Sequence, residues 1–480
     1  MLQGLLGICA SCAFLCAQDG APPPLQIGGV DISGTIHERY EEWDFFKAAK
    51  GESNYGFSGS MLRLMLSQKK QTYDWTVEFV APILLGLPNR AAQPAPLGQL
   101  GLGGNYYAAN RNSTDAASFF AKQAFFRVKG AHASLRMGRF EFAEGAEVTP
   151  KDATLAAIKR DRIAQRLIGI FGFADVQRSF DGLNYAYTDG PWNVTAVSVV
   201  PTRGVFQTDG WGWVTTPVSY AAVTRQMSLG NSSAEWRVFG IFYNDDRGVL
   251  KADNRPAAVR ALDTQGIDIG TYGGHYIQAI PTAVGTFDLL GWGALQNGRW
   301  GTQTQRAGAG DVEGGWQPPV LEAVRPWLRS GYFYSTGDGS PNDNTHGTFF
   351  AILPTPRVYA RFPFFNEMNN RDAFGELVLR PRKDLTFRSD VHGLWLANKD
   401  DLWYAGGGAF QPWTFGFSGR PSNGATGLAT LFDTSADYQV NRALALSVYF
   451  GYARGGEVIE HIFPADKNGK LGFVEANYRF

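Results

Sequence analysis

The chain has 480 residues, with 44 basic and 44 acidic side chains and a formal net charge of zero. This balance argues against a nucleic-acid-binding protein that is held by overall charge. Aromatic residues make up 14% of the chain, charged residues only 18%, and there are 58 glycines, a mixture that favours many short strands joined by turns.

The first seventeen residues, MLQGLLGICASCAFLCA, form an uncharged apolar run that ends at Ala17. An apolar centre followed by a small residue predicts a secretory signal peptide over 1–17, although no Lys or Arg precedes it. All three cysteines, Cys9, Cys12 and Cys16, lie in this segment, so the mature chain would contain none. A lipoprotein anchored through Cys12 or Cys16 is the alternative, but neither follows a convincing lipoprotein pattern. We expect 18–31 to be a periplasmic lead.

Beyond this segment no uncharged apolar run approaches the roughly 20 residues that a membrane-spanning helix needs. Several segments instead alternate with a period of two. In TYDWTVEFV (72–80), Asp74, Thr76 and Glu78 share one face, and the aromatic and aliphatic residues share the other. The segments 385–395, 431–441 and 444–452 alternate similarly, whereas 236–243 is apolar on both faces and 286–295 is mixed on both. Such alternation predicts β-strands with one apolar and one polar face.

The connections between these strands come in two kinds. Tight turns are predicted at 69–70, 130–131, 189–190, 382–383 and 441–442, and long loops at 82–118, 143–178, 335–372 and 397–427. Short turns at one end and long loops at the other are typical of an outer-membrane barrel. Counting strands between the connections predicts an all-β, transmembrane antiparallel β-barrel of about 18 strands over 32–480.

A secreted β-sandwich or propeller is the alternative fold, because it would also alternate. Charges in mid-strand, such as Glu78, Arg388 and Asp390, favour the barrel, since its polar face lines water. Strands of about ten residues exceed the usual five or six of soluble sheets. Aromatic residues also gather at strand ends, as Trp395 and Tyr452 do, where membrane interfaces are expected.

The long loop 143–178 contains TPKDATLAAIKRDRIAQRLIG (149–169), which predicts a helix capped by Thr149 with Pro150 at its first position. Its basic residues include Lys159, Arg160, Arg162 and Arg166. A basic helix in a long loop is a candidate gate or anion filter that folds into the pore. The alternative is a solvated helix that binds anionic lipopolysaccharide or rests on the barrel rim.

Strand parity also assigns charged side chains to the water-filled interior. The predicted lumen residues are Arg39, Glu41, Arg63, Arg325, Arg329, Arg388, Asp390 and His392. Arginine suits an anion pathway because its guanidinium stays charged and pairs bidentately with carboxylates. The alternative for each residue is an internal ladder of ion pairs that braces the wall, with Glu41, Glu78 and Asp390 as partners.

The chain ends on Phe480, and Tyr478, Ala476 and Val474 share its face. A terminal aromatic residue on an apolar face is expected where the strand meets lipid.

Five segments carry a family resemblance. They are HERYEEW (37–43), MGRFEFAEGAEV (137–148), RSFDGLNYAY (178–187), LLGWGALQNGRWG (289–301) and YFYSTGDGSPNDNTHGTFFAILPT (332–355). Together with the closing strand, they resemble the alginate-export family of outer-membrane porins. The resemblance implies a monomeric 18-stranded barrel in the bacterial outer membrane, in contact with lipid and lipopolysaccharide. It also implies an arginine-rich lumen that passes an anionic polysaccharide, and a C-terminal aromatic, Phe480, that the barrel-assembly machinery reads. The helix at 149–169 departs from the family pattern.

The expected function is therefore a passive channel for an alginate-like polysaccharide or a related organic anion, by export or by diffusion. A general or substrate-specific porin for small solutes is the first alternative, and a secreted carbohydrate-binding β-protein is the second. No catalytic motif is present, so we predict no enzyme, cofactor or metal. Asp338, Asn342, Asp343 and Asn344 offer oxygen ligands for calcium, but an ordinary asparagine-rich turn explains them better.

Overall fold

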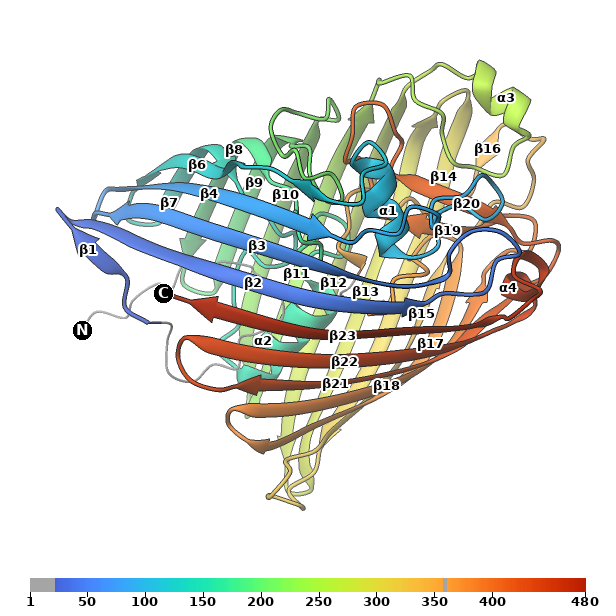
Figure 1. Cartoon of the computed structure of the whole chain (residues 1–480). Coiled ribbons are helices and arrows are strands. Elements are labelled where there is room, and N and C mark those ends of the chain that lie inside the picture. The colour runs from blue at the N-terminus through green and yellow to red at the C-terminus, as the bar shows by residue number, and fades with distance from the viewer. Residues whose placement is uncertain (1–21, 357–360) are drawn as a thin grey trace.

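The computed structural model describes residues 22–356 and 361–480, which form a closed antiparallel β-barrel (Figure 1). Within these residues eighteen strands make the wall, and β2 pairs with β23 to close it. The predicted fold class is confirmed, and the secreted soluble alternative is wrong. The predicted signal peptide, 1–17, lies outside the described residues.

The wall strands are β2 (Val30–Asp44), β3 (Asn54–Lys69), β4 (Tyr73–Leu85), β6 (Phe120–Lys129), β7 (Ala133–Phe140), β8 (Phe180–Asp189), β9 (Trp192–Pro201), β10 (Val218–Leu229), β11 (Ser232–Asp245), β12 (Ile267–Thr282), β13 (Gly285–Trp300), β14 (Gln303–Gln317), β15 (Trp327–Ser335), β17 (Asn370–Arg382), β18 (Leu385–Leu396), β21 (Gly427–Gln439), β22 (Leu444–Gly455) and β23 (Asn468–Arg479).

Shorter elements decorate this wall. They are β1 (Leu25–Ile27), β5 (Ala116–Ala117), β16 (Thr345–His346), the hairpin of β19 (Leu402–Gly406) and β20 (Phe417–Pro421), and the helices α1 (Leu102–Ala109), α2 (Ala153–Ile158), α3 (Ala257–Leu262) and α4 (Glu457–Ile462). A π-helical turn, η1 (Lys159–Ile163), continues α2. Among the described residues, no helix has the length and apolar character needed to cross a membrane.

The connections alternate between two ends of the barrel. At the turn end, most hairpins are joined by two to four residues, and 318–326 is the longer exception. At the loop end lie the long segments 86–119, 141–179, 202–217, 246–266, 336–369 and 397–426. The predicted tight turns and long loops are confirmed to within a few residues.

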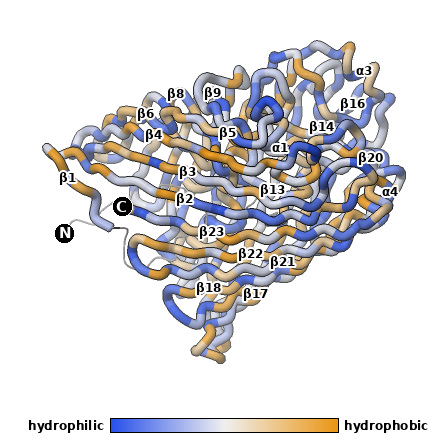
Figure 2. Tube along the Cα trace, in the orientation of Figure 1, coloured by the Kyte–Doolittle hydropathy of each residue, from blue (hydrophilic) through white to orange (hydrophobic). Residues whose placement is uncertain are grey.

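The two faces of the wall differ as alternation predicts. On β18, Phe387 and Val391 are exposed on the outside, while Asp390 and His392 are buried inside. Figure 2 shows hydrophobic positions recurring along the outer strands. The apolar face turns outward because its solvent is lipid, and the polar face turns inward to groups that satisfy its charges.

Much of the interior is filled by the long loops. Ile163, Leu167 and Ile168 of loop 141–179 belong to a buried cluster that includes Trp292 of β13 and Phe333 of β15. A second buried cluster joins Phe171 and Phe173 of the same loop to Phe206, Phe362 and Trp403 of other loops. The hydrophobic core therefore lies inside the barrel, between the loops and the wall.

Phe480 sits at the seam where the barrel closes. Its backbone exchanges two hydrogen bonds with Gly34 of β2, of 2.9 and 3.1 Å. A Cβ at position 34 would lie 2.5 Å from the Phe480 ring, so only glycine allows this close approach. The ring remains 43% exposed, as expected for an aromatic residue at a lipid interface.

Candidate functional site

The loop 141–179 carries a shorter helix than the sequence predicts. Asp152, not Thr149, caps it, because the Asp152 Oδ1 accepts the backbone N–H groups of Thr154 and Leu155 at 2.9 and 3.0 Å. Ala153–Ile158 is α-helical, and the chain then widens into the π turn. The turn ends before Gln165, whose φ of 68° prevents a regular helix from continuing to 169.

Three of the four predicted gating residues are held by carboxylates on the inner wall. The ion pairs are Lys159 Nζ with Glu235 Oε1 (2.6 Å), Arg162 Nε with Glu313 Oε1 (2.7 Å) and Arg166 Nη2 with Asp311 Oδ2 (2.5 Å). None of these side chains is more than 9% exposed. The helix therefore lies inside the barrel rather than on lipopolysaccharide or the rim. Arg160 differs, because it is 40% exposed and pairs with its neighbour Asp161.

The same loop also supplies carboxylates to arginines of the wall. These pairs are Glu141 with Arg63 (2.8 Å), Glu144 and Glu147 with Arg237 (2.7 and 3.5 Å), Asp161 with Arg388 (3.2 Å) and Asp175 with Arg39 (3.8 Å). Arg237 was missed by the sequence analysis because its strand looks apolar on both faces. Its inward parity, shared with Phe239 and Ile241, is the signal that identifies it.

Most of the predicted lumen residues lie on the inner face and are already ion-paired. Arg39 donates to Glu475 at 2.7 and 2.9 Å, and Glu41 accepts from Arg39 and from the Trp43 indole. Arg63 forms a bidentate pair with Glu78, and Arg329 pairs with Asp288 and Glu313. The ladder of ion pairs that the sequence left as an alternative describes these arginines.

Arg325 is a correction to the predicted set. It lies in the turn 318–326 rather than in β15, is exposed, and donates its Nε–H to the backbone carbonyl of Arg380. Pro326 explains the error, because proline has no N–H to contribute to a strand ladder and β15 begins only at Trp327. Arg325 therefore does not line the lumen.

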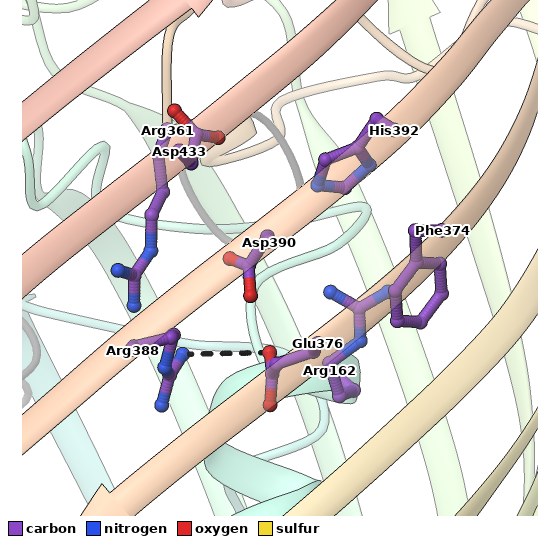
Figure 3. Close-up of a pocket in the computed structure, with 8 residues that line it drawn as sticks. All are labelled: Arg162, Arg361, Phe374, Glu376, Arg388, Asp390, His392 and Asp433. Carbon is purple, nitrogen blue, oxygen red and sulfur yellow. Dashed lines mark ion pairs between the residues drawn. The ribbon is translucent and has the colours of Figure 1, made fainter.

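Arg388, Asp390 and His392 border a small cavity between η1 and the wall strands β17, β18 and β21 (Figure 3). Its volume is about 10 Å³, close to the space of one water molecule. The cavity is lined by three guanidinium groups and three carboxylates, together with an imidazole and a phenyl ring: Arg162, Arg361, Arg388, Glu376, Asp390, Asp433, His392 and Phe374. A sugar cannot enter it in this closed state.

Asp390, His392 and Asp433 could by spacing hold a metal ion, because their ligand atoms lie within 4.8 Å of one another. However, three guanidinium groups line the same cavity and disfavour a further cation there. The His392 Nδ1 is also 2.9 Å from a carboxylate oxygen of Asp372. We interpret the group as part of the ion-pair network.

Two of the four residues that offer oxygen ligands for calcium, Asp338 and Asp343, instead accept backbone N–H groups. Asp343 Oδ1 accepts the Thr345 N–H at 2.8 Å, which is an ordinary turn contact. Asp338 Oδ1 accepts the Ser340 N–H at 3.2 Å, and its Oδ2 is buried without a hydrogen-bond partner in the described structure. The turn interpretation accounts for both residues.

Asp338→Asn is expected to reduce the pH dependence of loop 336–369. Burial, with a further contribution from Asp401, raises the pKa of Asp338 to about 6 from its ordinary 3.8. A raised carboxyl pKa stabilises the folded loop fully below about pH 4, and that contribution disappears as the pH rises through about 6. The loss is at most roughly 3 kcal/mol, because solvent screening reduces it. Hydrogen-exchange protection of 336–350, measured at pH 4 and 7.5, should fall in the wild type and fall less in the variant, where burial still raises the pKa of Asp401, which accepts hydrogen bonds from the same loop. Equal pH dependence in both proteins would contradict the prediction.

Comparison with known proteins gives a family and a fold. The family model described as alginate export matches residues 88–469. The crystal structure of the Pseudomonas aeruginosa outer membrane protein OpdK has 7% identity and a TM-score of 0.55, and covers 94% of this chain and 99% of its own. Acinetobacter baumannii OccAB2 has 9% identity and a TM-score of 0.56, with 95% and 98% covered. OpdK with vanillate has 7% identity and a TM-score of 0.52, with 94% and 98% covered. No curated protein matches the chain.

Proposed function

The chain belongs to the alginate-export family of bacterial outer-membrane channels, and from this premise we propose that its lumen passes an anionic polysaccharide or a related organic anion. The observation that carries the proposal is the set of inward arginines on separate strands that each hold a carboxylate: Arg39, Arg63, Arg237 and Arg388. A uronate carboxylate is the same chemical group. Family and fold are those of channels, and nothing in the described residues shows catalysis.

Passage through such a pore needs no chemical step. It needs several weak sites, so that an anion enters readily and also leaves. In the proposed pathway the solute carboxylate moves from one guanidinium to the next. Arg388, which borders the cavity with Asp390 and His392, is one of these sites. Arg39 and Arg63, which are more deeply buried, each lose one carboxylate partner and join the pathway when the loop moves. Arg329 lies on the same inner face but pairs with Asp288 and Glu313 of the wall.

We assign the gate to loop 141–179. The buried pairs of Lys159, Arg162 and Arg166 fasten it to β11 and β14. The cavity between the loop and β18 is about 10 Å³, and Ile163 and Leu167 of the loop pack in a buried cluster with wall residues. In the proposed mechanism the loop therefore moves before a polymer passes. Arg160, on the same turn, is exposed and faces the incoming solute.

A substrate-specific porin for small solutes is the second candidate. The cavity that favours it has guanidinium and carboxylate groups in equal number, which suits a small polar or zwitterionic solute as well as a polymer. The apolar outer surface meets outer-membrane lipid. We propose that lipopolysaccharide surrounds the loop end and that the barrel works as a monomer.

The substrate is tested by bilayer conductance of the refolded mature chain. Arg388→Gln should reduce anion selectivity and raise the half-blocking concentration of uronate oligomers about ten- to a hundredfold, because a charged hydrogen bond contributes roughly 1.5–3 kcal/mol. Arg325→Gln is the matched control, since Arg325 lies in an exposed turn, and should behave as the wild type. Absence of uronate block in the wild type would sink the anion claim and leave the small-solute porin.

We also propose that the barrel-assembly machinery reads Phe480. Deleting Phe480 should reduce the folded barrel recovered from cells several-fold, measured as the fraction that migrates as the compact form in unheated electrophoresis. Refolding in detergent should change less, because it uses no receptor. An equal loss in both settings would show instead that Phe480 acts through its seam contacts with Gly34.

A further inference from the structure

We infer that loop 141–179 is an internal substitute for the anionic solute: in this closed channel its carboxylates occupy the arginine sites that receive the solute's carboxylates. The inference rests on the proposed anion passage and adds to it the means by which the sites are kept occupied and then released. A polyanionic sugar chain is the ligand class.

The carboxylates of one loop reach arginines on four strands around the barrel. They are Glu141 to Arg63 of β3, Glu144 and Glu147 to Arg237 of β11, Asp161 to Arg388 of β18, and Asp175 to Arg39 of β2. A flexible chain with carboxylates at intervals would form the same series of ion pairs with these four strands. The loop thus makes the contacts that a polyuronate would make with the same wall.

These arginines differ in the carboxylate partners that they keep when the loop moves away. Arg39 keeps Glu475 and Arg63 keeps Glu78, both on wall strands. Arg237, in the described part of the chain, has ion pairs only with the two loop glutamates, and its other contacts are the Tyr220 hydroxyl and the rings of Tyr220 and Phe239. Loop release would therefore leave Arg237 with no carboxylate, and we expect it to attract the solute most strongly.

Asp161 is placed where an incoming anion meets the loop first. Asp161 and Arg388 are 17% and 15% exposed, whereas the other loop carboxylates and their arginines are at most 7% exposed. A single hydrogen bond of 3.2 Å joins the two side chains. A solute carboxylate that pairs with Arg388 through two hydrogen bonds would bind it more strongly. Displacement is therefore expected to begin at this pair.

The π turn makes this placement possible. From within η1, Lys159 reaches Glu235 of β11, Arg162 reaches Glu313 of β14, and Asp161 reaches Arg388 of β18. Widened turns of this kind are frequent at functional sites. Burial alone would raise the pKa of Asp161, but the guanidinium groups of Arg160, Arg388 and Arg361 hold it well below its usual range. Asp161 is thus an anion at every working pH.

Exchange of one carboxylate for another explains why the solute would not be trapped. Each arginine loses a loop carboxylate as it gains a solute carboxylate, so the charge in the wall is conserved and the net binding free energy stays small. Weak binding at several sites is the condition for passage. An anion does not compete for the wall acids that pair with Lys159, Arg162 and Arg166 in the closed channel. These acids therefore stay available to the loop's cations, which favours return of the loop.

The test compares three variants of the full mature chain in bilayers. Asp161→Asn removes the competing carboxylate and should lower the half-blocking concentration of uronate oligomers about three- to tenfold while raising the basal conductance. Asp161→Arg should raise conductance further through repulsion of Arg388. Adding Arg388→Asp to Asp161→Arg restores an ion pair of reversed sign and should restore wild-type conductance with weaker block.

Asp209→Asn is the matched control, because Asp209 is an exposed loop carboxylate that pairs with Arg203 of its own loop, and it should match the wild type. Compact migration in unheated electrophoresis confirms that each variant is folded. Raised conductance with unchanged uronate block would contradict the inference that the loop carboxylates occupy the solute's sites. It would still be consistent with an anion channel. Variants that match the wild type in both measurements would overturn it as well. Absence of block in the wild type would overturn the proposed function itself.

Discussion

The double variant Arg162→Met/Arg166→Met is expected to raise the single-channel conductance several-fold. Both arginines pair with wall carboxylates that are fully buried, Glu313 and Asp311. Removing one partner of a buried pair typically costs about 3–5 kcal/mol when the other charge is left uncompensated. This applies in full to Asp311, whereas Glu313 keeps its pair with Arg329 of the wall. The loop should leave the wall, and water and ions should enter the space that it filled. Conductance at fixed salt measures the result directly.

Two further variants separate the loop's anchors from nonspecific damage. Adding Glu313→Gln and Asp311→Asn removes the stranded charges and should return part of the low-conductance state. Lys151→Met neutralises an exposed cation of the same loop and should change little. If the double variant conducts as the wild type does, the loop is held by its apolar residues, such as Ile163 and Leu167, which pack in the buried cluster, and the ion pairs are not its anchors.

The wall was predictable because a barrel strand obeys a local rule. Alternation with period two sorts side chains between lipid and interior, so positions such as Asp390 and His392 are assigned from neighbours in the sequence. The rule weakened where the interior is itself apolar. Around Arg237, Phe239 and Ile241 pack inward on the loop cluster, so both faces of that strand look hydrophobic. It also failed at Arg325, where Pro326 delays the strand.

The site was less predictable because its contacts join distant segments. Lys159 and Glu235 are 76 residues apart, and Arg388 and Asp161 are 227 residues apart. A basic helix with an apolar face has the same local pattern whether it rests on lipid or inside a barrel, and only the wall carboxylates decide between them. The loop carboxylates were overlooked because the basic residues dominate the segment's composition. Comparing both the acidic and the basic residues of the loop with the inward-facing charges of each strand would have suggested these ion pairs.

Arg178→Met is expected to disorder the loops above the lumen. Arg178 is fully buried, and its guanidinium donates to the carbonyls of Ala409, Pro354 and Gly407 at 3.2, 3.3 and 2.5 Å. These carbonyls belong to loops 336–369 and 397–426, so one side chain fastens two loops to a third. Methionine fills similar space but donates no hydrogen bond.

Each buried carbonyl left without a donor costs about 1–3 kcal/mol, so the three together should destabilise the closed loops by at least about 3 kcal/mol. A change of that size corresponds to a more than about a hundredfold larger population of opened loops, since 1.4 kcal/mol is tenfold. Hydrogen exchange in 350–356 and 405–411 measures it. Arg260→Met, at a half-buried arginine that donates to carbonyls of its own loop 246–266, is the control and should leave exchange unchanged. Unaltered protection in the Arg178 variant would mean that the apolar clusters alone hold the loops, because Phe171 and Phe415 pack beside the segments that carry these carbonyls.

The conductance of that variant then distinguishes the two roles. A channel held shut by hydrogen-bonded loops should show larger current fluctuations when Arg178 is lost, whereas a channel held shut by loop 141–179 alone should not.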